Sequence, residues 1–503
     1  PHVPAVWSEG RETTYRELDT RANQVANALI AAGVRPGDRI CAMDQNHGLY
    51  FELIFGIAKA GAVFVPVNFR LAPPEVRAVI ADAEAELVFA GGPFCAMVEQ
   101  VRRDLPAVRK FIAFDRSDGV WQNYSALRDV LPTTDPCVPI DPSATTWQTY
   151  TSGTTGSPKG VEITTSNLLP YLLAMPSWLG GLREGQVAFT VAPFHFSAGI
   201  FYTLLTVIAG TTLVLVKEFE PAETLKLIGE RKINHAFLPP AVLLRILQVS
   251  STARADLTSL KSIVYGGSAI LTDVLRRAIA YFGCEFTQMY GLTETTAALT
   301  CLSWADHDLD GPNSHRLKSC GQPLYGTDIR AVDRNGRECP TGEMGEIVVR
   351  TPMMMKGYWK KPEATAEVIR DGWLYTGDGG IIDADGFIYI QDRIKDMIVS
   401  GGANIYSAEV ENCLIGHPAV ADVAVIGVPD ETWGEAVKAM VVLKPGAKAG
   451  ADELIEFCKG RIANYKRPRS VEFIASIPRN ANGKVLKREL RRPYWEGRER
   501  KVV

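Results

Sequence analysis

A run rich in glycine and hydroxyl side chains, residues 150–160, constrains this chain more than any other feature of its sequence. Its glycines let the backbone turn tightly and expose consecutive N–H groups. Its Ser and Thr hydroxyls and the mobile charge of Lys159 suit the oxygens of a polyphosphate. The run follows a short β-prone segment, residues 145–150. We therefore expect it to leave the end of a strand, which is where open α/β sheets place their ligands.

The spacing of this run differs from that of a Walker A loop. Lys159 lies three residues after Gly156 and is followed by Gly160, whereas a Walker A loop has its lysine directly after a glycine and before Ser or Thr. The spacing therefore disfavours an ordinary P-loop kinase or ATPase. On this run alone, a plain surface turn built from the same residue types stays open as the alternative.

Alternating helix and strand signals predict an α/β fold. A capping box, Thr14 with Glu17, opens an amphipathic helix that Gly33 ends, and strands follow at residues 39–43, 62–67 and 87–90. Further strands are expected at residues 186–191, 212–216, 236–238 and 262–265. Such repetition indicates parallel sheet layers with helices on their faces.

The pattern of predicted elements changes toward the C-terminus. Shorter strands with turn residues begin near residue 321, and a charged stretch, residues 392–396, separates two expected strands. Beyond it, strands at 420–428 and 436–443 and helices at 407–415 and 451–462 suffice for a small α+β domain. We predict a large N-terminal domain (1–392), a hinge (393–396) and a small C-terminal lid (397–503).

Composition narrows the class of protein. The length of 503 residues implies two or more domains, and 46% hydrophobic with 22% charged residues is typical of a soluble globular protein. A net charge of −3 gives no sign of a nucleic-acid binder. Nine scattered cysteines without a C-x-x-C pair predict reduced thiols and a cytoplasmic location, and no segment is apolar for long enough to span a membrane. The chain opens at Pro1 in mid-pattern, which leaves an upstream targeting segment as an open alternative.

Four further motifs carry candidate chemistry, and each is weak alone. In residues 290–294, Tyr290 offers a face on which a purine could stack, and Glu294 offers a carboxylate for Mg²⁺. Residues 372–378 end in Asp378, placed to bind the paired hydroxyls of a ribose. The charged stretch 392–396 follows, and residues 482–484 present Lys484 on an Asn-Gly turn.

In this order and over nearly the whole chain, the motifs closely resemble those of the adenylate-forming superfamily of acyl-CoA synthetases, luciferases and nonribosomal-peptide adenylation domains. The resemblance implies layered α/β sheets plus a small distorted barrel in the N-terminal domain, followed by a small mobile α+β domain. It also implies ATP, Mg²⁺ and CoA as the nucleotide, metal and co-substrate.

The resemblance assigns a role to each motif residue. Glu294 would hold Mg²⁺, Thr293 would bind an α-phosphate oxygen, and Lys484 would bridge the substrate carboxylate and the ribose–phosphate region. Asp378 and Arg393 would bind the ribose, and Lys395 would be the hinge. The residues implied for the phosphates are Thr151, Ser152, Gly153, Thr154, Thr155, Gly156 and Lys159, and those implied for the adenine are Gly266, Gly267, Ser268, Tyr290 and Gly291.

A second half-reaction is implied after rotation of the small domain about Lys395. Gly401, Gly402, Ala403 and Asn404 would then face a tunnel for the pantetheine thiol of CoA. Two departures from the family pattern stand out. Ala403 replaces a common Glu, which weakens the case for CoA as the acceptor, and Gly379 follows Asp378 where an apolar residue is usual.

The resemblance also places an acid-binding pocket. Its implied lining is Phe194, His195, Phe196, Ala198 and Gly199, together with Phe237, Leu238 and Tyr265. His195 would gate the pocket or touch the carboxylate; a histidine packed among aromatic rings and bonded to backbone is the alternative. No aspartate occurs in residues 194–200 to hold an α-amino group, which favours a fatty or aryl acid over an amino acid.

The predicted function is an ATP-dependent acid–CoA ligase that releases AMP and pyrophosphate, and a homodimer stays an open alternative to a monomer. Three alternatives stay open. The same adenylation could pass the acyl group to an amine or to the phosphopantetheine of a carrier protein acting in trans. A luciferase-type oxygenase shares the motifs, and a catalytically silent nucleotide-binding protein could use the same fold.

Overall fold

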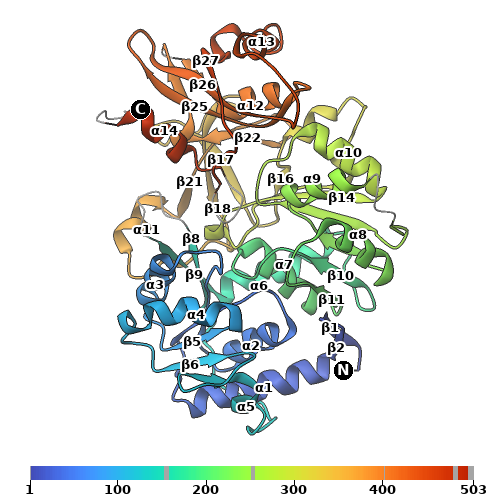
Figure 1. Cartoon of the computed structure of the whole chain (residues 1–503), viewed down its shortest axis with the longest axis vertical. Helices are drawn as coiled ribbons and strands as arrows, with labels where there is room; N and C mark the ends of the chain where they lie inside the picture. The colour runs from blue at the N-terminus through green and yellow to red at the C-terminus, as the bar shows by residue number, and fades with distance from the viewer. Residues whose placement is uncertain (1, 152–157, 251–254, 402, 480–484, 497–503) are drawn as a thin grey trace. The chain divides into compact units, whose positions relative to one another are not determined.

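The computed structural model describes the chain except for residues 1, 152–157, 251–254, 402, 480–484 and 497–503 (Figure 1). The chain forms two compact units. The first comprises Pro1–Asp328 and Arg350–Leu374, and the second comprises Ile329–Val349 and Tyr375–Val503. Residues 393–396 were predicted as a hinge about which the C-terminal domain rotates, whereas the two units are defined by how compactly the chain packs. The hinge therefore stays a prediction.

A nine-stranded sheet forms one layer of the first unit (Figure 1). The strands from β14 to β1 pair in parallel, and the two edges of the sheet are antiparallel. In order across the sheet the strands are β16 (Gln322–Pro323), β15 (Thr300–Leu302), β14 (Glu285–Tyr290), β13 (Ser262–Gly266), β12 (His235–Phe237), β10 (Val187–Thr190), β11 (Thr212–Leu215), β1 (Pro4–Ser8) and β2 (Arg11–Thr14). The strands expected near residues 186–266 are confirmed as β10 to β13.

An eight-stranded sheet forms the other layer of this unit. Its order is β19 (Gly357–Tyr358), β9 (Lys159–Thr164), β8 (Thr145–Thr151), β4 (Val63–Pro66), β3 (Arg39–Met43), β5 (Leu87–Ala90), β6 (Lys110–Ala113) and β7 (Trp121–Asn123). The glycine-rich run leaves strand β8 as expected. The chain then returns as the antiparallel strand β9, with Thr151 opposite Lys159. A Walker A loop would lead into a helix instead.

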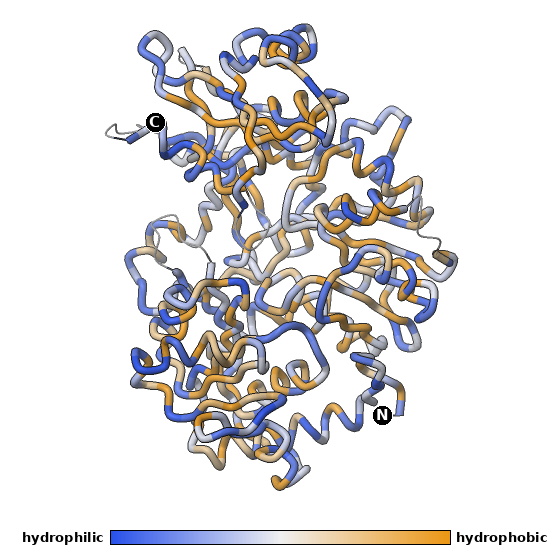
Figure 2. The backbone as a smooth tube through the Cα atoms, viewed as in Figure 1, coloured by the Kyte–Doolittle hydropathy of each residue, from blue (hydrophilic) through white to orange (hydrophobic). Residues whose placement is uncertain are grey.

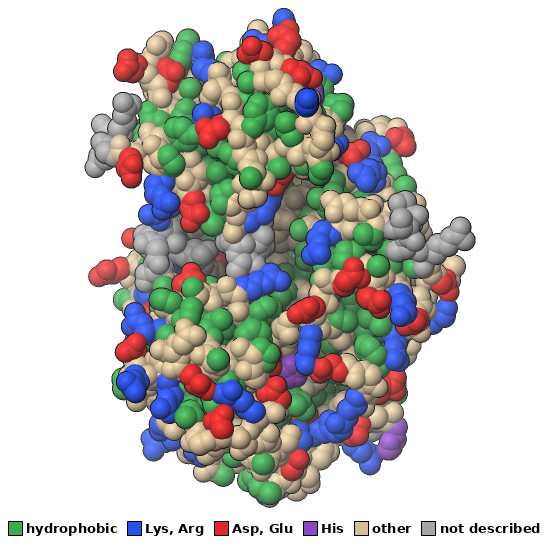
Figure 3. Space-filling model, in the orientation of Figure 1, with side chains coloured by type: hydrophobic (Ala, Val, Ile, Leu, Met, Phe, Trp, Pro, Cys, Tyr) green, Lys and Arg blue, Asp and Glu red, His purple; other side chains and the backbone are tan. Residues whose placement is uncertain are grey.

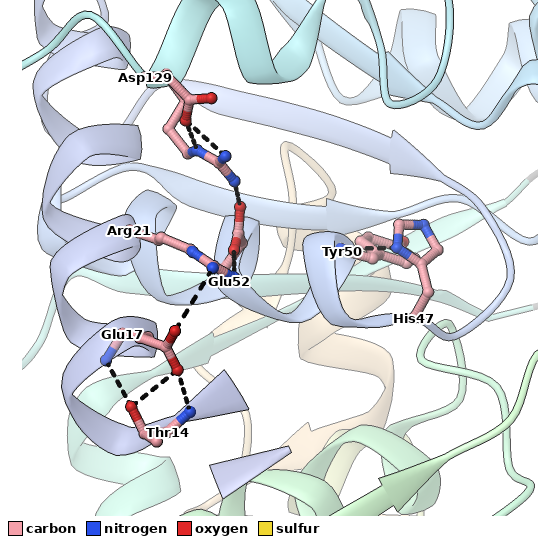
Figure 4. Close-up of polar contacts among 8 residues, drawn as sticks. Thr14, Glu17, Arg21, His47, Tyr50, Glu52 and Asp129 are labelled. Atoms are coloured by element: carbon pink, nitrogen blue, oxygen red, sulfur yellow. Dashed lines mark hydrogen bonds and ion pairs between the residues drawn. The ribbon is translucent and has the colours of Figure 1, made fainter. Parts of the chain in front are cut away.

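Helices cover the sheets of the first unit. They are α1 (Tyr15–Ala31), α2 (Gly48–Lys59), α3 (Pro73–Asp82), α4 (Gly92–Val101), α5 (Tyr124–Arg128), α6 (Thr165–Trp178), α7 (Ser197–Ile208), α8 (Pro221–Glu230), α9 (Pro240–Val249), α10 (Thr272–Phe282) and α11 (Pro362–Val368). The capping box predicted for α1 is confirmed (Figure 4): the Glu17 N–H donates to Thr14 Oγ1 at 3.2 Å, and the Thr14 N–H donates to Glu17 Oε2 at 2.8 Å. No described helix is long and apolar enough to cross a membrane.

A buried carboxylate ties three of these helices together (Figure 4). Glu52 on α2 is 1% exposed and pairs with Arg128 of α5, and Arg21 of α1 lies 3.7 Å from its second oxygen. Burial raises the pKa of Glu52, and the Arg128 charge opposes that shift. Two arginines therefore compensate the cost of keeping this charge away from water.

Apolar residues concentrate along the strands (Figure 2). Alternate residues of the nine-stranded sheet, among them Phe189, Ala236 and Ile263, pack against α8, α9 and α10. A second core lies between the eight-stranded sheet and α3 and α4. Charged side chains of both signs are interspersed over the face drawn in Figure 3, in keeping with a net charge of −3.

The second unit contains most residues of the later strands, whereas β20 belongs to the first unit. One sheet holds β17 (Asp328–Val332), β18 (Met344–Arg350), β21 (Trp373–Ile382), β20 (Ile369–Arg370) and β22 (Ile388–Arg393). The other holds β24 (Ala403–Ile405), β23 (Ile398–Ser400), β26 (Gly434–Leu443), β25 (Val420–Asp430) and β27 (Ser470–Phe473). Its helices are α12 (Ser407–Ile415), α13 (Ala451–Phe457) and α14 (Lys487–Trp495). The prediction that α13 reaches residue 462 is wrong, because the chain turns after Cys458 and Gly460 adopts a left-handed φ of +73°.

Candidate active site

The base of the candidate phosphate loop is a two-stranded ladder. Thr151 on β8 pairs with Lys159 on β9, which places both at the mouth of the loop. The Lys159 ammonium lies 4.9 Å from the ring centroid of Tyr358 on β19, the strand beside β9. The other phosphate-binding candidates, Ser152, Gly153, Thr154, Thr155 and Gly156, lie outside the described residues.

Tyr358 also contacts the candidate metal ligand. Its hydroxyl donates to Glu294 Oε1 at 2.9 Å, and Glu294 belongs to the single turn η2 (Thr293–Thr295) that follows β14. Lys159 lies on a strand of the eight-stranded sheet and Glu294 in the turn after a strand of the nine-stranded sheet, and both lie against this one tyrosine. Tyr358 was not predicted from the sequence, although a pair of aromatic residues, Tyr358 and Trp359, directly before two lysines was a usable signal.

The segment of residues 290–294 meets the start of α7. Ser197, the first residue of α7, donates its hydroxyl to Thr293 Oγ1 at 3.2 Å. Gly291 is required here for packing, because a Cβ at this position would lie 2.5 Å from the Ala297 carbonyl. The loop therefore folds back on itself and holds Thr293 and Glu294 at the carboxyl end of β14.

The candidate adenine-binding residues lie at the same edge of the nine-stranded sheet. Gly266 ends β13 and pairs with Met289, one residue before Tyr290 at the end of β14. A Cβ on Gly266 would lie 2.2 Å from the Met289 carbonyl oxygen, so only glycine fits. Gly267 turns with a φ of +79° into open space, and Gly267 and Ser268 are exposed. The structure thus brings Gly266, Gly267, Ser268 and Tyr290 together.

The residues predicted to line the acid pocket pack against different helices. Phe194 is 1% exposed and packs on Tyr50 and Phe51 of α2, with ring centroids 5.5 and 5.9 Å apart. Phe237 faces α7, where its ring lies 5.6 Å from that of Tyr202. Leu238 and Tyr265 lie in the core against α8–α10.

The remaining residues of this segment are close to α7. Gly199 is buried, and a Cβ there would lie 2.8 Å from Ala192 Cβ, so this glycine allows α7 to pack on the preceding turn. Phe196 and Ala198 are half-buried. The hydroxyl of Tyr265 is engaged elsewhere, 2.9 Å from His307 Nε2.

His195 is a neutral side chain in an aromatic cage. It is 6% exposed, with the rings of Phe69 and Phe196 at 5.1 and 4.2 Å. Burial, with a smaller contribution from the Arg70 charge, lowers the pKa of His195 to about 3. Its Nε2 has no hydrogen-bond partner among the described residues. At neutral pH this imidazole can exchange hydrogen bonds with a ligand but carries no charge.

In the second unit, the candidate ribose residues face one another across β21 and β22. Asp378 and Arg393 are register partners, and Arg393 Nε lies 2.8 Å from Asp378 Oδ1. Arg393 also donates to the Thr376 carbonyl oxygen at 3.0 Å. Gly379, the departure from the family pattern, leaves room for Met344: a Cβ would lie 2.6 Å from the end of that side chain.

The candidate thiol loop is the hairpin of β23 and β24. Gly401 has a φ of +59° and donates its N–H to the Trp433 carbonyl oxygen at 2.8 Å. A Cβ on Gly401 would lie 2.5 Å from the Trp433 ring, so only glycine lets the two meet. Trp433 is 43% exposed, and the Arg469 guanidinium lies 4.8 Å from its ring centroid.

Three predicted residues of the second unit cannot be placed in the same detail. Lys395 lies in the turn η5 (Ile394–Asp396), after β22, and its side chain is not described. Gly402 and Lys484 lie outside the described residues. Their roles stay predictions.

Comparison with known proteins identifies the family. The model of the family "AMP-binding enzyme" matches residues 1–359, and that of the "AMP-binding enzyme C-terminal domain" matches residues 409–484. A fatty acid–[acyl-carrier-protein] ligase, ScoC of Streptomyces coeruleorubidus, is 40% identical, covering 100% of this chain and 95% of that protein. A feruloyl-CoA synthase of an Amycolatopsis species is 38% identical, covering 98% and 96%.

A solved structure agrees in fold along nearly the whole chain. The crystal structure of the anthranilate CoA ligase AuaEII, in complex with anthranoyl-AMP, superposes with a TM-score of 0.90 at 28% identity, covering 98% of this chain and 94% of that one. The predicted resemblance and the predicted fold class are thereby confirmed. The chain belongs to the AMP-binding enzyme family, within the adenylate-forming superfamily, and is an enzyme of the AMP-forming ligase class.

Proposed function

We propose that this enzyme uses ATP to convert a carboxylic acid into an acyl-adenylate and then transfers the acyl group to the thiol of CoA, releasing pyrophosphate and AMP. The observation that carries the proposal is the meeting of Lys159 and Glu294 on Tyr358. A cation at the mouth of a glycine-rich loop and a carboxylate beside it are what a magnesium-bound polyphosphate requires.

The chain's own residues fit a magnesium ion. Glu294 offers a hard carboxylate oxygen, held in place by the Tyr358 hydroxyl at 2.9 Å. No three His, Cys, Asp or Glu side chains gather as a metal site among the described residues, so the phosphates would complete the coordination. Bound there, Mg²⁺ would neutralise phosphate charge.

Charge repulsion is the main obstacle that the protein must overcome in the first step. The substrate carboxylate and the α-phosphate of ATP are both anions, so their approach is unfavourable without cations. Lys159 at the loop and Lys484, arriving from the C-terminal segment, would offset this repulsion as the carboxylate oxygen displaces pyrophosphate in line. Thr293, already fixed by Ser197, would donate to an α-phosphate oxygen. No protein nucleophile is needed.

The ribose would bind to Asp378. This carboxylate is 4% exposed, and Arg393 fixes one of its oxygens at 2.8 Å. A carboxylate held in this way can accept hydrogen bonds from two adjacent hydroxyl groups. Arg393, held beside it, would bind the ribose as well.

The surroundings of Gly401 favour CoA as the acceptor. The exposed indole of Trp433 beside this glycine offers a face for an adenine ring, and Arg469 next to it offers charge for phosphates. A free amine would use neither group. A carrier-protein phosphopantetheine is the second candidate, supported by Ala403 in place of the usual Glu and by the 40% identity to a relative named as an acyl-carrier-protein ligase.

The cellular location is also part of the proposal. All nine cysteines are free thiols in the structure. Such cysteine usage supports a reducing compartment, and we place the enzyme in the cytoplasm.

A pyrophosphate-release screen tests the proposed function. The enzyme is incubated with ATP, Mg²⁺ and panels of aliphatic, aryl and amino acids, with and without CoA, and the products are identified by mass. Acid-dependent pyrophosphate release that ends in an acyl-CoA is expected. Release without a thioester would move the acceptor to a carrier protein or an amine, and the absence of release with every acid would refute the proposal.

A further inference from the structure

Asp82 accepts hydrogen bonds from two distant parts of the chain. It is the last residue of α3, and its Oδ2 accepts from the Tyr150 hydroxyl at 2.7 Å. Its Oδ1 accepts from the Lys361 ammonium at 2.7 Å, and its carbonyl oxygen accepts from the Trp359 indole N–H at 3.0 Å. One residue outside the candidate active site therefore joins the end of β8 to the turn that follows β19 (α3, β8 and β9 are labelled in Figure 1).

Helix stability alone does not explain a carboxylate at this position. The C-terminal end of a helix carries partial negative charge, so an acidic residue in the last turn is unfavourable there. The described last turn of α3 contains no basic residue that would offset it, and the compensating charge comes from Lys361. The contacts that Asp82 makes with other segments therefore account for it better than its own helix does.

Tyr150 connects Asp82 to the mouth of the candidate phosphate loop. It pairs across the ladder with Gly160, the residue after Lys159. Its hydroxyl donates to Asp82 and accepts from the Gln148 amide at 2.9 Å. A Cβ on Gly160 would lie 2.7 Å from Gln148 Nε2 and 3.1 Å from Tyr150 Cζ, so this glycine lets both side chains lie over β9. The hydrogen bond to Asp82 thus fixes the ladder that carries Lys159.

Trp359 and Lys361 connect Asp82 to Tyr358. Trp359 directly follows Tyr358, and its backbone N–H donates to the Gly160 carbonyl oxygen at 2.8 Å. The turn after β19 is therefore bound to β9 through its backbone and to Asp82 through two side chains. Through these contacts Asp82 fixes the place from which the Tyr358 ring projects.

The turn after β19 is strained where Asp82 holds it. Lys360 lies between Trp359 and Lys361 and adopts a φ of +50°, in the left-handed region that residues with a Cβ rarely occupy. Such a backbone conformation costs free energy and persists where the surrounding contacts fix it. The residues on both sides of Lys360 donate to Asp82, so loss of Asp82 would let the turn relax.

We propose that Asp82 is a positioning residue for the nucleotide, which fixes Lys159 and Glu294 relative to each other without touching the substrate. The inference rests on the proposed function and deepens it. Tyr358 joins the two charges, because its ring centroid lies 4.9 Å from the Lys159 ammonium and its hydroxyl donates to Glu294 at 2.9 Å. Charges that are already in place stabilise a magnesium-bound polyphosphate without a cost of reorganisation. Asp82 preserves this arrangement by holding β8 and the turn after β19.

The test compares the wild type with Asp82→Ala and Asp82→Asn, using the acid that gives the fastest pyrophosphate release. Asp82→Ala should raise the KM for ATP by about 10- to 100-fold and leave the KM for the acid unchanged. The dissociation constant of ATP with Mg²⁺, measured by calorimetry without acid, should rise by a similar factor. Asp82→Asn keeps one acceptor oxygen in its side chain and should fall between the wild type and Asp82→Ala.

Glu84→Gln is the matched control, because it also changes a carboxylate to an amide. Glu84 pairs with Lys360 of the same turn, but both side chains are more than half exposed, so this substitution should change neither KM. A double-mutant cycle adds Tyr150→Phe, which removes the hydroxyl that donates to Asp82. The effect of Tyr150→Phe on the KM for ATP should be smaller in the Asp82→Ala background than in the wild type, and additive effects would contradict the connection.

Thermal unfolding separates positioning from a purely structural role. A lower melting temperature of Asp82→Ala with an unchanged KM and dissociation constant for ATP would overturn the inference, as would equal rises in the KM values for ATP and acid. Asp82→Asn and Tyr150→Phe carry the same test if Asp82→Ala does not fold. Absence of pyrophosphate release with every acid would refute the proposed function, whereas the dissociation constants for ATP would still test Asp82.

Discussion

Replacing Asp378 by Asn removes the negative charge of the candidate ribose site while preserving its shape. Asp378 is 4% exposed, and its partner Arg393, 2.8 Å away, is 38% exposed. Because Arg393 can turn toward water, losing the ion pair itself should cost little, and the variant should fold. The substitution should instead weaken the binding of ATP.

The magnitude follows from the hydrogen bonds to the ribose. A hydrogen bond to a charged group contributes about 1.5–3 kcal/mol, and every 1.4 kcal/mol is tenfold, so Asp378→Asn should raise the KM for ATP by about 10- to 100-fold. Wild-type enzyme should suffer a comparable loss when 3′-deoxy-ATP replaces ATP. If the carboxylate and this hydroxyl bind each other, the two losses should not add.

The assay is pyrophosphate release with each nucleotide and each enzyme, which forms a double-mutant cycle. Coupling of more than about 1 kcal/mol between the Asp378→Asn change and the missing hydroxyl is expected. Additive losses, with Asp378→Asn weakening ATP and 3′-deoxy-ATP equally, would refute the assignment of Asp378 to the ribose.

The remaining predictions concern the hinge, the thiol site and acid stability. Lys395→Pro should spare pyrophosphate release and suppress thioester formation, because proline stiffens the backbone of the turn after β22. Lys395→Ala is the control. Equal loss of both half-reactions in the proline variant would contradict the hinge. Trp433→Ala should raise the KM for CoA by about 10- to 100-fold without changing adenylation, because base stacking contributes about 1–3 kcal/mol; pantetheine, which has no adenine, is the control, and a matching rise in its KM would contradict stacking. Burial lowers the pKa of His195 to about 3 and that of His307 to about 4, below the value near 6.5 expected in the unfolded chain. The unfolded state therefore binds more protons below pH 6.5, and stability should fall as the pH drops from about 6.5 toward 4. Urea unfolding should give a lower midpoint at pH 5 than at pH 7, and His195→Gln should make the two midpoints more alike. Identical midpoints at both pH values in the wild type would contradict the buried neutral state of these histidines.

Much of the fold could be read from the sequence because local signals agree with the tertiary structure. The capping box of Thr14 and Glu17 opens α1, and the apolar runs of the central strands appear where they were expected. The helix predicted at residues 451–462 was wrong at its C-terminal end, because α13 ends at Phe457. Its apolar pattern continues through Ile462, whereas the left-handed backbone at Gly460 shows that the chain has already turned.

The candidate site was harder to predict, for a physical reason. Strands buried on both faces lack the polar–apolar alternation that reveals which way each side chain points. Phe237 and Leu238 are adjacent and both apolar, yet they face opposite sides of the sheet. Tyr358 and Trp433 were missed because their importance comes from contacts with Glu294 and Gly401, which lie more than thirty residues away in sequence.

Acid-dependent exchange of labelled pyrophosphate into ATP without CoA measures the formation of an acyl-adenylate itself, separately from transfer to the acceptor. The exchange should require both an acid and Mg²⁺. Lys484→Ala should slow it by about 10²–10³-fold, the usual cost of removing one preorganised charged donor. ATP consumption that yields ADP, or exchange that proceeds equally without any acid, would contradict activation of an acid through an acyl-adenylate.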